Sequence, residues 1–181
     1  VDFTVPPFTL ISELHSYQAD SVIIATGATA KWLGLPNEEK YRGFGVSGCA
    51  TCDGFFYRNR HVAVVGGGNT AAEEALYLSN IAASVTLIHR RNELRADKIL
   101  QNRLFNHPKI NIEWDSVVTD VLGTDEPKSM TGVKIKNLKT DNVRELKVDG
   151  LFVAIGHKPN TEIFKSVLEL DKDGYIVTSP G

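Results

Sequence analysis

The chain of 181 residues contains only two cysteines and one methionine, and it has no long apolar run. Its net charge is −2, because 20 Lys+Arg are balanced by 22 Asp+Glu. A chain without a positive field attracts neither nucleic acid nor an anionic membrane surface, so neither is an expected partner. Its apolar stretches are far shorter than the roughly 20 residues that cross a bilayer. The 42% of hydrophobic residues nevertheless suffices for a core, which excludes a disordered chain.

The few cysteines and the single methionine support two expectations. Cys49 and Cys52 are too close in sequence to join distant parts of a fold, as the disulfides of secreted proteins do. We therefore expect a cytoplasmic protein that uses its thiols for chemistry. The chain begins with Val1, its methionine is Met130, and no signal-peptide pattern precedes the first strand-like segment. We expect it to be a piece of a longer protein.

Strand and helix patterns alternate in the middle of the chain, which predicts an α/β fold with a Rossmann-like parallel sheet. Short alternating segments between residues 110 and 148 predict a small antiparallel β-meander beside that sheet. The other predicted elements are strands at 61–65, 84–88 and 151–156, and helices at 69–80 and 92–106.

The first 48 residues carry weaker patterns. Phe3–Leu10 predicts an edge strand or a loop beside one, because Pro6 and Pro7 interrupt its alternation. Asp20–Gly27 is β-branched and ends in Thr26-Gly27, which predicts a buried parallel strand that enters a tight turn. Residues 28–48 are rich in glycine without a sustained period and predict a connecting loop.

A dinucleotide-binding fingerprint, G-x-G-x-x-G/A, is matched by Gly66-Gly67-Gly68-Asn69-Thr70-Ala71. In such a turn Gly66 permits the sharp bend, Gly68 lets the backbone approach a pyrophosphate, and Ala71 keeps helix and strand close. Glycine-rich turns are common, so a plain structural turn is the alternative. A strand before the turn and a helix after it favour nucleotide binding.

The second strand ends in His89-Arg90-Arg91, with Arg95 one helical turn further on. An NAD site places a carboxylate here for the ribose hydroxyls, whereas a 2′-phosphate calls for arginine. Guanidinium groups bind phosphate through charge-assisted bidentate hydrogen bonds. The cluster therefore favours NADPH over NADH; the alternative is a run of solvated charges at the start of a helix.

The motif Cys49-Ala50-Thr51-Cys52-Asp53 has three interpretations. A structural zinc site needs further ligands, and the chain offers no other cysteine and only scattered histidines. Inert buried thiols are a second interpretation. The third is a redox dithiol, in which one thiolate attacks an external disulfide and the other resolves the mixed disulfide. Asp53 would then move the proton, or it caps the turn. Phe55–Tyr57 are expected to pack this loop onto the core.

These motifs together resemble low-molecular-weight, bacterial-type thioredoxin reductase. The resemblance extends over essentially the whole chain and rests on Gly48–Gly54, Gly66–Leu78, His89–Arg91 and Val153–His157. It implies an NADPH-binding domain inserted into a split FAD domain. Residues 1–29 would be a remnant of the FAD domain, 30–157 the NADPH domain, and 158–181 the start of the returning FAD segment.

The resemblance also implies the reaction and its residues. NADPH would reduce FAD, FAD would reduce the Cys49–Cys52 disulfide, and the dithiol would reduce thioredoxin. Cys52 would face the flavin, Cys49 would exchange with thioredoxin, and Asp53 would be the acid/base. The parent would be a homodimer, without a metal; the chain alone is expected to bind NADP(H) but not to reduce thioredoxin. The implied cofactor-binding residues are Gly66, Gly68, Asn69, Thr70, Ala71, Glu73, His89, Arg90, Arg91, Arg95, Gly156, His157, Thr26 and Gly27.

Two alternatives belong to other functional classes. A peroxiredoxin-reducing flavoprotein subunit shares the C-x-x-C-D-G motif but typically uses NADH, which the arginine cluster disfavours. A redox-sensing nucleotide-binding module, or a relative of ferredoxin reductases, would not use the cysteine pair for turnover. The function of the cysteine pair therefore distinguishes these alternatives.

Overall fold

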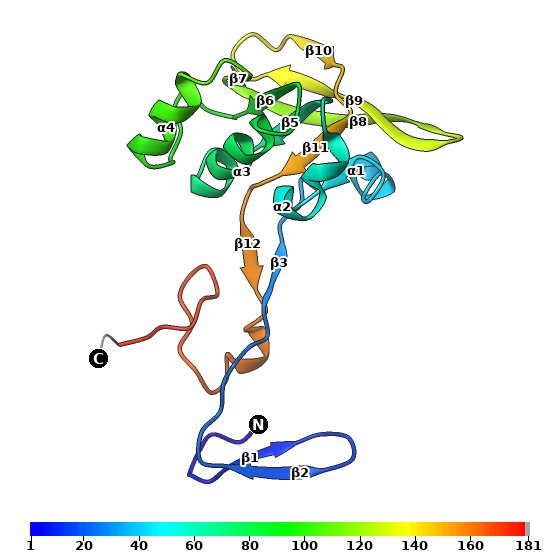
Figure 1. Cartoon of the computed structure of the whole chain (residues 1–181). Helices are drawn as coiled ribbons and strands as arrows, with labels where there is room; N and C mark the ends of the chain where they lie inside the picture. Colours follow the sequence, from blue (N-terminus) through cyan, green and yellow to red (C-terminus); the bar gives the residue numbers. More distant parts are fainter. Residues whose placement is uncertain (180–181) are drawn as a thin grey trace. The chain divides into compact units, whose positions relative to one another are not determined.

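The computed structural model describes residues 1–179, which form two compact units (Figure 1). The larger unit is Ala30–Gly156. The smaller unit combines Val1–Thr29 with the chain from His157 onward. The larger unit contains both Trp32 and Trp114, so tryptophan fluorescence reports on this unit alone.

A five-stranded parallel sheet with the strand order β4-β11-β5-β6-β7 is the centre of the larger unit. All four pairings in this sheet are parallel, as the βαβ pattern of the sequence predicts. The expected Rossmann-like fold is confirmed. The strands are β4 (Val46–Ser47), β5 (His61–Val65), β6 (Ser84–Ile88), β7 (Ile110–Glu113) and β11 (Gly150–Val153).

Different layers cover the two faces of this sheet. Alternate side chains of a strand point to opposite faces, so Val62 and Val64 pack with helices α3 (Asn69–Ser79) and α4 (Lys98–Phe105). On the other face, Ala63 and Val65 pack against the expected antiparallel meander (Figure 1). The meander consists of β8 (Ser116–Asp125), β9 (Lys128–Asn137) and β10 (Val143–Leu146).

The smaller unit consists of short elements. Its strands β1 (Phe8–Ile11) and β2 (Ser16–Ala19) form an antiparallel hairpin. Strand β12 (His157–Pro159) pairs with β3 (Ala28–Ala30), and a 3-10 helix follows at Glu162–Phe164. The Phe3 ring contacts the rings of Phe8 and Phe164 edge-on.

Two sequence predictions about the first 48 residues are wrong. Residues 21–27 form no strand, and Ile23 is 91% exposed, because no other described strand pairs with this segment. Residues 28–48 are not one loop. They contain β3, β4 and the short helix α1 (Pro36–Lys40). Pro36 favours the start of this helix, because proline suits the first helical turn. None of the helices among residues 1–179 is long and apolar enough to cross a membrane.

Glu38 of α1 is a fully buried carboxylate that organises the preceding loop. Its oxygens accept hydrogen bonds from the backbone N–H groups of Leu33 and Gly34 at 2.8 Å, and from that of Leu35 at 3.4 Å. Without Glu38 these N–H groups would lack a hydrogen-bond acceptor beside the core. The carboxylate takes the place of water as their acceptor. Glu38 thereby fixes the conformation of residues 33–35.

We expect Glu38→Gln to lower the free energy of unfolding by about 2 kcal/mol, because an amide cannot accept all of these bonds and places its own NH2 against an N–H. Denaturant unfolding followed by tryptophan fluorescence measures this change. The neighbouring exposed Glu39→Gln is the matched control and should stay within about 0.5 kcal/mol of the wild type. Equal effects of the two variants would contradict this role of Glu38.

Candidate active site

The parallel strands bring the predicted site segments to one edge of the sheet. Parallel neighbours have their carboxyl ends at the same edge, and ligands of open α/β sheets bind there. The cysteine motif follows β4, and Gly66–Gly68 follow β5. His89–Arg91 follow β6, and Ala154–Gly156 follow β11. The cysteine motif and the glycine turn therefore lie at the same edge of one unit.

The glycine turn is packed so closely that side chains are excluded at two of its positions. A Cβ on Gly66 would lie 2.6 Å from the Cβ of Ala71 and 2.4 Å from the carbonyl oxygen of Ala154. A Cβ on Gly67 would lie 2.1 Å from Cε1 of His89. By contrast, a Cβ on Gly68 would meet nothing within 4 Å. The backbone at Gly68 is therefore accessible to a ligand. Gly68 lies directly before the first residue of α3.

The middle glycine of the turn, Gly67, also holds the next segment of the chain. Its carbonyl oxygen accepts hydrogen bonds from Arg95 N at 2.7 Å and Ala96 N at 3.1 Å. These bonds tie residues 95–96 to the turn, and α4 begins at Lys98 rather than at residue 92 as the sequence pattern predicts. Gly67 thereby sets the position of Arg95 relative to the turn.

His89 is a buried support of the turn, with 6% of its surface exposed. Its Nε2 donates to the carbonyl oxygen of Glu93 at 2.9 Å, and its ring meets that of Trp114 edge-on. Burial lowers the pKa of His89 below its ordinary value of 6.5, and the charges of Arg90 and Arg91 act in the same direction. The neutral imidazole is therefore favoured beneath the turn.

A cleft of about 540 Å³ opens between the glycine turn, the end of β6 and the start of β8. The predicted residues that line it include the guanidinium-bearing Arg90 and Arg95, while Arg91 is exposed outside the lining. Within residues 1–179, no carboxylate forms an ion pair with any of these three arginines. Their charge is thus available for an anion. The other predicted residues in the lining are Gly66, Gly68, Thr70, His89 and Gly156.

Further predicted residues lie elsewhere. Asn69 exchanges two hydrogen bonds of 2.8 Å with Asp97, so its side chain ties the start of α3 to the start of α4. Glu73 is exposed on α3, and Ala71 is buried beneath Gly66.

Three of the predicted cofactor-binding residues belong to the smaller unit. The carbonyl oxygens of Thr26 and Gly27 accept hydrogen bonds from the Nδ2 and N of Asn160, and His157 is exposed at the start of β12.

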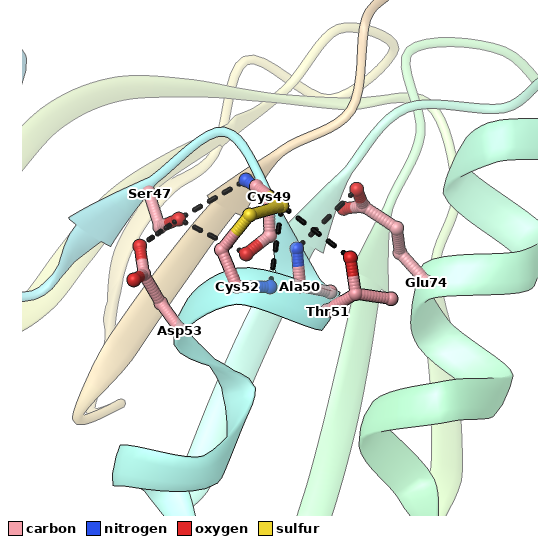
Figure 2. Close-up of a disulfide and its surroundings, with 7 residues drawn as sticks. All are labelled: Ser47, Cys49, Ala50, Thr51, Cys52, Asp53 and Glu74. Atoms are coloured by element: carbon pink, nitrogen blue, oxygen red, sulfur yellow. Dashed lines mark hydrogen bonds between the residues drawn. A yellow bond between two sulfur atoms is a disulfide. The ribbon is translucent and has the colours of Figure 1, made fainter.

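The cysteines form a disulfide, with their Sγ atoms 2.05 Å apart (Figure 2). The short helix α2 (Ala50–Asp53) begins directly after Cys49, and the N–H of Cys52 donates to Cys49 Sγ at 3.2 Å. The hydroxyl of Thr51 lies 3.4 Å from the same sulfur. Cys49 is half-buried and Cys52 is exposed. The disulfide is therefore accessible, which contradicts the alternative of inert core thiols.

The carboxylate of Asp53 has a partner that the sequence did not reveal. Ser47, at the end of β4, donates its hydroxyl to Asp53 Oδ2 at 2.6 Å (Figure 2). The same hydroxyl oxygen accepts from the N–H of Cys49 at 3.0 Å. On the opposite side, Glu74 of α3 accepts from the N–H of Ala50 at 3.4 Å. No motif signals Ser47 or Glu74, because their proximity arises from strand and helix packing.

The aromatic residues after the cysteines were only partly predicted. Tyr57 packs edge-on against Phe152 of the core, as expected. Phe55 and Phe56, in the 3-10 helix Gly54–Tyr57, are 66% and 74% exposed, so the expectation that they pack the loop is wrong. Among residues 1–179, no three His, Cys, Asp or Glu side chains are grouped to hold a metal ion.

The contrast between two neighbouring glycines gives a direct test of the turn. Gly67→Ala should lower the free energy of unfolding by about 2 to 3 kcal/mol, because its Cβ overlaps a ring that is hydrogen-bonded in place. Gly68→Ala should change it by less than about 0.5 kcal/mol. Denaturant unfolding measures both variants, and a neutral Gly67→Ala would contradict the packing of the turn on His89.

The sequence matches the family described as pyridine nucleotide-disulphide oxidoreductase over residues 4–180. The chain is 52% identical over its whole length to thioredoxin reductase of Rickettsia prowazekii. It is 54% identical to a Pseudomonas fluorescens protein named glucosaminate ammonia-lyase. Among solved structures, Lactococcus lactis thioredoxin reductase in its FR conformation matches 94% of this chain and 56% of its own, with 44% identity and a TM-score of 0.85.

These comparisons confirm the resemblance to thioredoxin reductases. The chain spans 59% of the Rickettsia relative and 56% of the Pseudomonas one. The match to the family covers nearly all of the sequence and includes the glycine turn and the cysteine pair. The chain therefore belongs to the pyridine nucleotide-disulphide oxidoreductase family.

Proposed function

We propose that the whole protein is an NADPH-dependent flavoprotein that reduces the disulfide of thioredoxin through Cys49 and Cys52. One observation carries this proposal: an accessible disulfide and an arginine-bearing nucleotide cleft lie at the same edge of one sheet. The relatives named thioredoxin reductase support it, and because the chain spans only 59% of the Rickettsia relative, the activity is proposed for the whole protein.

The residues of the cleft fit NADP(H). The open backbone at Gly68 and the N-terminus of α3 suit a pyrophosphate, which backbone N–H groups and the helix dipole attract. Thr70 adds a hydroxyl. Arg90 and Arg95 would hold the 2′-phosphate, with Arg91 beside them, while His89 would support the turn from below. When bound, NADPH would supply a hydride, and FAD in the whole protein would supply the two electrons that reduce the disulfide.

The smaller unit is proposed to belong to the FAD domain, whose segments 1–29 and 158–181 flank an NADPH domain of residues 30–157. His157 itself lies with the smaller unit. The exposed Ile23 in an apolar, unpaired segment supports this assignment, because a larger sheet would give that segment strand partners. We further propose that Thr26 and Gly27, which Asn160 holds, contribute backbone contacts to the flavin.

The disulfide chemistry follows from the contacts of the two sulfurs. Uptake of two electrons and two protons breaks the Cys49–Cys52 bond and leaves two thiols. The N–H of Cys52 and the hydroxyl of Thr51 both face Cys49 Sγ, so they stabilise negative charge on that sulfur. The Cys49 thiolate is therefore the proposed nucleophile, and Asp53 is the proposed group that takes up and returns the proton.

The exchange with thioredoxin then takes two steps, in each of which one S–S bond breaks and another forms. The Cys49 thiolate breaks the S–S bond of thioredoxin and forms a mixed disulfide. The Cys52 thiolate next attacks Cys49 Sγ, which re-forms the intramolecular disulfide and releases thioredoxin with both sulfurs reduced. The exposed rings of Phe55 and Phe56, in the 3-10 helix that follows the cysteines, support a protein substrate, because aromatic residues are enriched at interfaces. The Pseudomonas fluorescens relative is named an ammonia-lyase. Elimination of ammonia transfers no electrons to an acceptor, so the presence of a disulfide favours a reductase over a lyase.

The cofactor part of this proposal is tested by thermal unfolding of the chain with NADP+ and with NAD+. Ligand at about 100 times its dissociation constant adds about 2.7 kcal/mol, which raises the midpoint by about 5 to 10 °C. We expect this shift with NADP+ and a smaller one with NAD+. The double variant Arg90→Ala/Arg95→Ala should remove the preference for NADP+. Arg103→Ala, which removes an exposed arginine from α4, is the control and should retain it. Equal shifts with both nucleotides would contradict the assignment.

A further inference from the structure

The buried hydroxyl group of Ser47 contacts both Asp53, the proposed acid/base, and the backbone of Cys49, the proposed nucleophile. It ends the edge strand β4, pairs in register with Phe152 of β11, and is 6% exposed. The sheet therefore fixes its backbone, whereas Asp53 follows the cysteines on a short helix. Figure 2 shows the carboxyl group of Asp53 turned toward this serine.

The serine hydroxyl has one hydrogen atom and two acceptors within reach. Oδ2 of Asp53 lies at 2.6 Å and the carbonyl oxygen of Cys49 lies at 3.4 Å. A carboxylate is the stronger acceptor, so the hydrogen belongs to Asp53 while that residue is ionised. The N–H of Cys49 donates to the hydroxyl oxygen at 3.0 Å and keeps the serine in place.

The same contacts serve a protonated Asp53. Its O–H would then donate to the hydroxyl oxygen of Ser47, and the serine hydrogen would turn to the carbonyl oxygen of Cys49. Only a rotation of the hydroxyl group is needed. An acid/base group must be held in both of its protonation states during a cycle, and this arrangement provides a partner for each.

We propose that Ser47 is a positioning residue that holds the carboxyl group of Asp53 in both protonation states during thiol–disulfide exchange. The inference rests on the proposed function in taking Asp53 as the acid/base. It adds a buried residue that acts through Asp53.

The test is the rate at which the reduced chain is oxidised by hydroxyethyl disulfide, followed by alkylation of the remaining thiols. The reaction consumes two protein thiols, forms the Cys49–Cys52 disulfide and releases two molecules of mercaptoethanol, so no nucleotide or flavin is needed. Asp53→Asn should slow it about 100-fold, as loss of acid/base catalysis does. Ser47→Ala should slow it about 10-fold, because a displaced carboxyl group loses part of that catalysis.

A double-mutant cycle separates positioning from a structural role. If Ser47 acts through Asp53, adding Ser47→Ala to Asp53→Asn should change the rate by less than about 2-fold. Ser47→Thr retains the hydroxyl group and should restore the rate to within about 3-fold of the wild type. Ser79→Ala, which removes another buried hydroxyl group, on helix α3, should leave the rate unchanged.

The outcomes distinguish this inference from the proposed function. If Ser47→Ala slows the Asp53→Asn protein by the same factor as the wild type, or if it slows neither, the inference is overturned and the proposed function stands. If Asp53→Asn has no effect, the acid/base role is wrong and the inference fails with it. Tryptophan fluorescence confirms that each variant is folded, and if Ser47→Ala is not, a wild-type rate for Ser47→Cys, which lacks the hydroxyl group, overturns the inference.

Discussion

The close approach of Gly67 to His89 is the contact on which the cleft depends. At this contact the turn after β5 lies against the ring that follows β6, and the carbonyl oxygen of Gly67 fixes Arg95. The turn, His89 and the backbone of Arg95 therefore hold one another in place. Burial keeps His89 neutral by lowering its pKa, so no positive charge is placed beneath the turn. The proposed dinucleotide site needs this rigidity, because each displaced donor weakens the binding of a phosphate.

The redox centre depends on the same sheet by a different route. Ser47 belongs to the edge strand β4, and its hydroxyl group joins the strand to Asp53 and to the N–H of Cys49. The disulfide itself lies on a single turn of helix, which alone would give it little rigidity. Partly buried hydrogen bonds from Ser47 of the sheet and from Glu74 of α3 add rigidity to the short helix. The cleft and the disulfide thus share one scaffold while using separate residues.

Much of this arrangement could be predicted from the sequence. The strands at 61–65 and 84–88, the helix from Asn69 and the glycine fingerprint all have local patterns with clear periods. Helix α1, the later start of α4 and the unpaired segment 21–27 could not be predicted, because tertiary contacts or missing strand partners decide them. The role of Gly67 depends on His89, which follows a different strand, and the role of Ser47 depends on a carboxyl group six residues away. Sequence motifs therefore locate the site, whereas packing determines which residues support it.

The central claim is that Cys49 and Cys52 carry electrons from NADPH to thioredoxin in the whole protein. The most direct measurement is oxidation of NADPH by that protein with oxidised thioredoxin as the acceptor, compared among the wild type, Cys49→Ser and Cys52→Ser. We predict turnover by the wild type alone, and accumulation of a mixed disulfide with thioredoxin when reduced Cys52→Ser is used, since Cys49 is then left unresolved. Thioredoxin reduction at the wild-type rate by Cys49→Ser would contradict the account.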